Sequence, residues 1–195
     1  MRIVAVSQRV DNHPDRNEIR DALDRRLTAF VRLCGYVPAP VPNNLDVAIH
    51  DWLNIVNPAA VILSGGNNIG QHLERDDTET SLLIFAMEHK LPLLGICRGM
   101  QMMACWAGAD LHSVLDHVGA RHHLSGEINC VVNSYHNFSL LRCPDDFEVL
   151  ARSEDGEIEA IRHQFLPWEG WMWHPEREES FANHDVQRVK VLFGG

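Results

Sequence analysis

Short apolar runs alternate with amphipathic stretches along the first half of the chain. Residues 2–7, 59–66 and 91–96 are mostly apolar and end at a polar residue or near glycine, a pattern typical of strands buried on both faces of a parallel sheet. Between and after these runs, apolar side chains recur at helical spacing among charged ones. The helices predicted from this spacing cover residues 17–33, 46–54, 77–89 and 98–108.

The rest of the chain has a different pattern. Residues 36–43 contain three prolines, which confine any strand there to an edge of the sheet or to its own ends. Residues 110–140 are rich in loop-forming residues and histidine, and turn sequences separate the strand-like segments that follow. These segments, which we expect to add antiparallel strands, cover residues 147–152, 156–163 and 170–176, before a closing helix over residues 184–193.

The alternation of strands and helices over the first 108 residues implies parallel strands joined by right-handed crossovers. We therefore predict an α/β fold: a single domain over residues 1–195 with a doubly wound, mostly parallel sheet and helices on both faces. A length of 195 residues suits one domain, and 45% hydrophobic with 23% charged residues is an ordinary globular composition.

Charge and cysteine content exclude several classes of function. A formal net charge of −10 without a block of Lys or Arg argues against a nucleic-acid partner, which would require many phosphate contacts. The chain has neither the pattern of a signal peptide nor an apolar run of the roughly 18 residues that a membrane span needs, so no membrane partner is expected. Five cysteines, an odd number without metal or redox spacing, predict a cytoplasmic protein with reduced thiols.

One of these cysteines stands between a buried strand and a helix. Gly95, Cys97 and Gly99 form a G-x-C-x-G stretch, the thiol counterpart of the nucleophile elbow G-x-S-x-G. The small residues allow close chain packing, and the N-terminus of the following helix favours a thiolate. A structural cysteine is the alternative, because free cysteines are commonly buried and inert.

A nucleophilic cysteine needs a base and a group that orients the base. His174 directly follows an aromatic-rich strand-like segment, and Pro175 places it in an extended or turn conformation, so Glu176 could fold back toward the imidazole. Upstream, Gly65 and Gly66 end a neighbouring predicted strand, where backbone amides could bind a substrate oxygen. Each of these features also fits a plain turn.

Together, G-I-C-R-G-x-Q, the Gly-Gly turn and W-H-P-E resemble the class I glutamine amidotransferase superfamily, and the resemblance extends from about Ile3 to Glu176. It implies the flavodoxin-like fold of that superfamily. It also implies a catalytic triad of Cys97, His174 and Glu176, and an oxyanion hole formed by the amides of Gly66 and Arg98.

Residues 132–137 (VNSYHN) and 156–161 (GEIEAI) resemble the γ-glutamyl hydrolase branch of this superfamily. The resemblance implies that Gln101 lines the pocket for the glutamyl group. It further implies that Ser134 and Tyr135 lie in the loop that holds the α-amino and α-carboxylate groups through backbone contacts, with a supporting role for His136. Cleavage would release glutamate through a thioester on the cysteine.

Two functions share this machinery: a free-standing hydrolase of a small γ-glutamyl amide, and a glutaminase subunit that supplies ammonia to a separate synthetase. The sequences SQRV and EIRD near the N-terminus resemble the hydrolase branch more closely. LSGGN and SQR are also similar to hydrolases that cleave γ-glutamyl-CDP-amidate. We therefore expect Arg9, with Arg16 and Arg20 nearby, to face an anionic leaving group, although all three could simply be solvated.

The histidine-rich segment raises one further class, a metal protein. His112, His117, His122 and His123 lie close together in sequence, and imidazole is a common metal ligand. Their spacing matches no zinc signature, and the chemistry outlined above requires neither metal nor cofactor, so none is expected. A catalytically inactive binding protein is a fourth reading, which the presence of the triad residues opposes. The oligomeric state remains open, a homodimer included.

Overall fold

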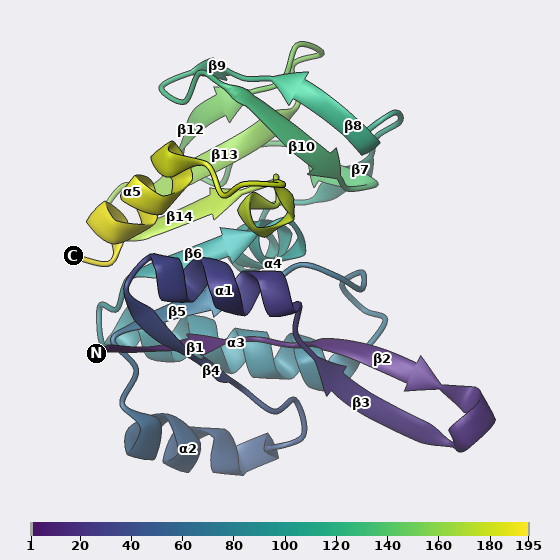
Figure 1. The fold of residues 1–195 in the computed structure, drawn as a ribbon, viewed down its shortest axis with the longest axis vertical. Helices are drawn as coiled ribbons and strands as arrows, with labels where there is room; N and C mark the ends of the chain where they lie inside the picture. The colour runs from purple at the N-terminus through teal and green to yellow at the C-terminus, as the bar shows by residue number, and fades with distance from the viewer. Residues whose placement is uncertain (1, 195) are drawn as a thin grey trace.

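The computed structural model describes residues 2–194, and its centre is an eight-stranded sheet in the order β4-β1-β5-β6-β14-β13-β12-β9 (Figure 1). Strands β4, β1, β5, β6 and β14 run parallel, and β13, β12 and β9 extend the sheet antiparallel. The strands of this sheet are β1 (Arg2–Val6), β4 (Tyr36–Pro40), β5 (Ala60–Leu63), β6 (Leu93–Ile96), β9 (Ser125–Gly126), β12 (Phe147–Arg152), β13 (Ile158–His163) and β14 (Trp168–Trp171).

Helices cover both faces of the sheet because its strands alternate their apolar side chains between two cores. Val4 and Val6 of β1 pack with helices α1 and α5, whereas Ala5 packs on the opposite side with α2, α3 and α4. The predicted mostly parallel α/β fold is thus confirmed. The helices are α1 (Arg25–Leu33), α2 (Ile49–Val56), α3 (Leu73–Glu88), α4 (Arg98–Trp106) and α5 (Asn183–Leu192), with short 3-10 helices η1 (Pro14–Arg16), η2 (Asp46–Ala48) and η3 (Pro175–Arg177).

The prediction of one helix over residues 17–33 was wrong in its first part. Residues 9–22 form an antiparallel hairpin of β2 and β3 that extends away from the sheet in Figure 1, and α1 begins only after Asp24, whose side chain accepts a hydrogen bond from Arg26 N. Ile19 has an apolar side chain at helical spacing but is 70% exposed, so no tertiary packing supports a helix there. The strands are β2 (Arg9–His13) and β3 (Glu18–Ala22).

The segment 110–140, expected to be loop-rich, instead contributes small strand pairs. They lie at the upper end of the molecule in Figure 1, and two of them form sheets of their own. These pairs are β7 (Leu111–Ser113) with β11 (Phe138–Leu140), and β8 (Val118–His123) with β10 (Val131–Tyr135).

Three further expectations can be compared with the structure. The proline-rich strand β4 lies at the sheet edge, as predicted. Helix α3 begins at Leu73, earlier than the expected start at residue 77. Strand β14 pairs antiparallel with β13 but parallel with β6, so it is the boundary between the two parts of the sheet. Across residues 2–194, no helix has the length and apolar character needed to cross a membrane.

Candidate active site

Cys97 occupies a strained turn between β6 and α4. Its backbone has φ 52° and ψ −109°, a combination that non-glycine residues rarely adopt and that is typical of a nucleophile elbow. The glycines on either side permit the turn: a Cβ on Gly99 would collide with the carbonyl oxygen of Leu63, and one on Gly95 would lie 2.7 Å from the carbonyl oxygen of Gly99. The glycine spacing seen in the sequence is therefore a packing requirement.

His174 lies beyond the end of β14, the strand next to β6. Its Nδ1 is 2.6 Å from Oε1 of Glu176, and both residues are buried. Because a carboxylate only accepts hydrogen bonds, Nδ1 carries the proton, and Nε2 is left for a second partner. Trp171 and Trp173 stack beneath this segment with ring centroids 5.1 Å apart, so they pack in the core rather than line a pocket.

The electrostatics of His174 connect it to Cys97. Burial alone would lower the pKa of the imidazole, but the charge of Cys97 and hydrogen bonds with Cys97 and Glu176 raise this pKa to about 9. The imidazole is therefore protonated near neutral pH. The structure thus places the predicted cysteine, histidine and glutamate in one interacting group.

Asn133 fixes the backbone of His174, and sequence analysis did not identify it. Its side-chain amide donates to the carbonyl oxygen of His174 at 2.8 Å, and its Oδ1 accepts from the His174 amide at 3.0 Å. Both hydrogen bonds are buried, so they hold the imidazole at a set position. Asn133 lies directly before the predicted substrate residues Ser134 and Tyr135, but no local pattern distinguished its amide from theirs.

The Gly65-Gly66 turn follows β5 and lies against His174. A Cβ on Gly65 would come within 2.6 Å of the imidazole Cε1, so only glycine fits at this contact. Arg75 from α3 holds the turn: its guanidinium donates to the carbonyl oxygens of Ser64 (2.8 Å), Gly65 (3.1 Å) and Gly66. With the carbonyls held by Arg75, the turn presents a defined backbone to the site.

Arg75 belongs to a buried group of charges that sequence analysis missed. Glu79 accepts hydrogen bonds from Arg75 (3.1 Å), from Ser7 (2.7 Å) and from Arg98, and Arg98 also pairs with Asp76. Burial and the neighbouring Arg75 lower the pKa of Arg98 to about 9. The side chain of Arg98 is thus directed into this group, while its residue begins α4 directly after Cys97.

Two adjoining pockets meet at Gly66 and His174. The first pocket contains Cys97 and is lined by most of the predicted substrate residues. The second lies beneath the β2–β3 hairpin, where Arg9 forms an ion pair with Asp11 at 2.7 Å. The predicted residues that line the first pocket are Gly66, Cys97, Arg98, Gln101, Tyr135, His136 and His174.

Not every predicted residue reaches a pocket. The Ser134 side chain points away, and its hydroxyl donates to the carbonyl oxygen of His117 at 2.6 Å. On the hairpin, Arg16 and Arg20 lie outside the pocket that contains Arg9, and Arg20 pairs with Glu18 instead. Gln101 lines the first pocket, and its amide donates to the carbonyl oxygen of Phe138 at 2.9 Å.

The fold and site define an α/β protein with a cysteine on a nucleophile elbow and a His–Glu pair at the carboxyl ends of neighbouring parallel strands. Comparison with known families agrees. The chain matches the family "Glutamine amidotransferase class-I" over residues 19–192, and it belongs to this family.

Curated relatives include both hydrolases and components of larger enzymes. The chain is 32% identical over 165 residues to a gamma-glutamyl-CDP-amidate hydrolase of Campylobacter jejuni, which covers 82% of this chain and 80% of the relative. It is also 32% identical over 167 residues to anthranilate synthase component 2 of Thermococcus kodakarensis, which covers 80% of this chain and 83% of the relative.

A solved structure shows the same fold. A putative GMP synthase protein from Thermoplasma acidophilum superposes with a TM-score of 0.75 at 21% identity, covering 100% of this chain and 94% of the other.

Proposed function

We propose that this protein is a cysteine-dependent amidohydrolase that cleaves the γ-glutamyl amide bond of a small γ-glutamyl compound. The observation that carries the proposal is the buried interaction of His174 with both Cys97 and Glu176 beside a pocket. This arrangement supplies a nucleophile, a proton carrier and a group that orients the carrier. The family relationship adds the expectation of a glutamyl substrate.

The reaction begins when the Cys97 thiolate attacks the δ-carbonyl carbon and forms a C–S bond. The amides of Gly66 and Arg98 bind the oxyanion, each worth about 3 kcal/mol of transition-state stabilisation. His174 donates its proton to the departing nitrogen as the C–N bond breaks. A water molecule then attacks the thioester, gives its proton to His174, and releases glutamate and the thiolate.

The first pocket is the site for the glutamyl group. Gln101 and the loop that carries Ser134, Tyr135 and His136 would hold its α-amino and α-carboxylate groups, with Ser134 contributing through its backbone because its side chain is engaged elsewhere. Tyr135 is supported by the guanidinium of Arg177, which lies 4.7 Å from the ring centroid. This part of the substrate corresponds to the portion that leaves as glutamate.

The second pocket is the site for the leaving group. It shares Gly66, His174 and Arg177 with the first pocket, and the β2–β3 hairpin brings Arg9 to its edge. A chain that carries a leaving-group wall of its own can act without a synthetase partner, which supports the hydrolase. An anionic leaving group, such as a phosphorylated nucleotide, would complement Arg9.

The second candidate is a glutaminase subunit that delivers ammonia to a separate synthetase. Its support is the set of relatives named as components or subunits of larger enzymes, such as anthranilate synthase component 2. Both candidates use the same cysteine chemistry. They differ in whether the chain alone turns over γ-glutamyl amides larger than glutamine.

The test is glutamate release by the purified chain, without a partner protein, from glutamine and from a panel of γ-glutamyl amines and γ-glutamyl nucleotide amidates. We expect at least one γ-glutamyl amide to exceed glutamine in kcat/KM. Cys97→Ala should abolish release while keeping the circular dichroism spectrum, and Cys105→Ala, a thiol outside both pockets, should leave it unchanged. Wild-type rates in Cys97→Ala would refute the mechanism, and turnover only with a synthetase would favour the second candidate.

A further inference from the structure

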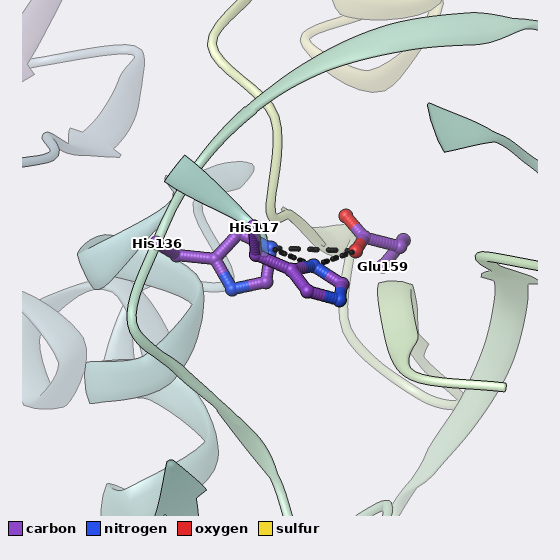
Figure 2. Close-up of side chains that lie close together, drawn as sticks. All are labelled: His117, His136 and Glu159. Carbon is purple, nitrogen blue, oxygen red and sulfur yellow. Dashed lines mark hydrogen bonds and ion pairs between the residues drawn. The ribbon is translucent and has the colours of Figure 1, made fainter. Parts of the chain in front are cut away.

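Three buried side chains from distant parts of the chain meet behind the first pocket. His117 precedes β8, His136 lies between β10 and β11, and Glu159 belongs to β13, and Figure 2 shows the two rings and the carboxylate directed at one another. His117 Nδ1 lies 3.2 Å from His136 Nε2, and Glu159 Oε1 lies 3.5 Å from the former and 3.3 Å from the latter. All three side chains are at most 1% exposed.

Hydrogen bonds on the far sides of the two imidazoles determine which nitrogens carry protons. His117 Nε2 lies 2.8 Å from a carboxylate oxygen of Asp155, and His136 Nδ1 lies 3.0 Å from the carbonyl oxygen of Phe138. Both oxygens can only accept, so these nitrogens donate. The neutral rings therefore direct bare lone pairs, from His117 Nδ1 and His136 Nε2, toward each other and toward Glu159.

Glu159 adds the third lone-pair donor. Both of its carboxylate oxygens are buried, and neither has a hydrogen-bond partner within residues 2–194. A buried carboxylate without a partner is costly, because it has lost its hydration and gained nothing in exchange. Three electron-pair donors within 3.5 Å of one another repel unless a cation lies between them.

We propose that His117, His136 and Glu159 bind a structural transition-metal ion, with Zn²⁺ as the best match. Metal–ligand bonds of about 2.0–2.1 Å in a tetrahedral site place neighbouring ligand atoms roughly 3.3 Å apart. The three measured separations of 3.2, 3.3 and 3.5 Å fit this geometry. Imidazole nitrogen and carboxylate oxygen are suitable zinc ligands, and Asp155 and the Phe138 carbonyl are the outer partners that such histidines usually have.

His122 is the nearest further donor for the fourth position. Its ring centroid lies 4.2 Å from that of His117, and its Nε2 is buried without a hydrogen-bond partner in the described chain. The other histidines of the sequence cluster are placed elsewhere. His112 pairs with Glu157 at 3.0 Å, and His123 is exposed.

The ion would tie the loop after β10 to the central sheet. The carbonyl oxygen of His117 accepts hydrogen bonds from Ser134 Oγ and from the His136 amide, and the carbonyl oxygen of Glu159 accepts one from Met172, two residues before His174. A metal at the three side chains would hold the Tyr135 loop against this strand. Its role is positional, because Cys97 and the His174–Glu176 pair belong to a separate group.

The test is elemental analysis of the tag-free protein together with Co²⁺ binding to chelator-treated protein. We expect about one zinc per chain, a lower Tm after removal by a chelator, and visible absorption bands on Co²⁺ loading. Glu159→Gln and His136→Ala should each lose the metal. Their matched controls, Glu157→Gln and His112→Ala, alter the neighbouring His–Glu pair and should keep it.

Two results would overturn the proposal. One is wild-type protein that contains no metal and gains neither Tm nor absorption bands with Zn²⁺ or Co²⁺, in which case a shared proton holds the cluster together. The other is Glu159→Gln retaining metal at the wild-type level. If the variants do not fold, titration of chelator-treated wild-type protein with Co²⁺ still decides between these outcomes, and none depends on the catalytic activity.

Discussion

The imidazole of His174 rests directly on the α-carbon of Gly65, where an added Cβ would lie 2.6 Å from Cε1. Gly65→Ala should therefore push the ring away from Cys97 while leaving the cores intact. Because small displacements of catalytic groups are costly, we expect kcat to fall by roughly 100-fold. Steady-state kinetics with the best substrate of the panel, alongside circular dichroism, would measure both effects.

Gly108→Ala is the control for backbone strain. Gly108 has a φ of 87°, but a Cβ there meets no atom within 4 Å. The variant should lose about 1 kcal/mol of stability and keep its kcat. Equal kcat in Gly65→Ala and wild type would show that the contact with His174 does not position the imidazole.

The protonated His174 should make stability depend on pH. Its pKa rises from 6.5 to about 9, since the effects of Cys97 and Glu176 outweigh that of burial, so protonation stabilises the folded state. This contribution, roughly 3 kcal/mol, is fully present below pH 6.5 and is lost as pH rises toward 9. The advantage of wild type over His174→Gln in urea unfolding should therefore be larger at pH 6 than at pH 9.5.

NMR titration checks the same relationship at the residue itself. The His174 ring should titrate near pH 9 in wild type and at lower pH in Cys97→Ala, which lacks the negative charge and the hydrogen bond of the thiolate. His184→Gln alters a half-exposed histidine and should follow the pH dependence of wild type. An unchanged His174 titration in Cys97→Ala would contradict the proposed thiolate–imidazolium pair.

Arg75 should be among the most sensitive positions for stability outside the apolar core. Arg75→Met would leave Glu79 short of a buried partner and release the carbonyls of the Gly65-Gly66 turn. Breaking a buried ion pair from one side costs about 3–5 kcal/mol, measurable by urea unfolding. The exposed Arg32→Met on α1 should cost under about 0.5 kcal/mol. A loss below about 1 kcal/mol in Arg75→Met would mean that the charge group contributes little.

Arg9 should discriminate between leaving groups. Arg9→Ala should raise KM about tenfold for a phosphorylated γ-glutamyl substrate, the equivalent of about 1.4 kcal/mol, and leave an uncharged γ-glutamyl amine unaffected. Arg20→Ala, on the same hairpin but outside the pocket, should change neither. Equal effects on both substrates would remove the case for an anionic leaving group.

Much of the fold could be predicted because its signals are local. Each buried parallel strand is a continuous apolar run, and each crossover helix has its own periodicity, so their order appeared without tertiary information. The elbow at Cys97 is also local, because two glycines within four residues are needed for the chain to turn. The same patterns misplaced the start of α1, since Ile19 has helical spacing but nothing to pack against.

The sequence by itself determined the fold class, the family and the candidate cysteine, histidine and glutamate, because these depend on periodicity and on residues close together along the chain. Tertiary structure alone decided which side chains support them: Asn133 behind His174, Arg75 around the glycine turn, and the pairing of His117 and His136 with Glu159. The physical reason is that these groups are satisfied by partners many residues away. Hydrogen bonds and ion pairs of that kind leave no periodic trace in the sequence.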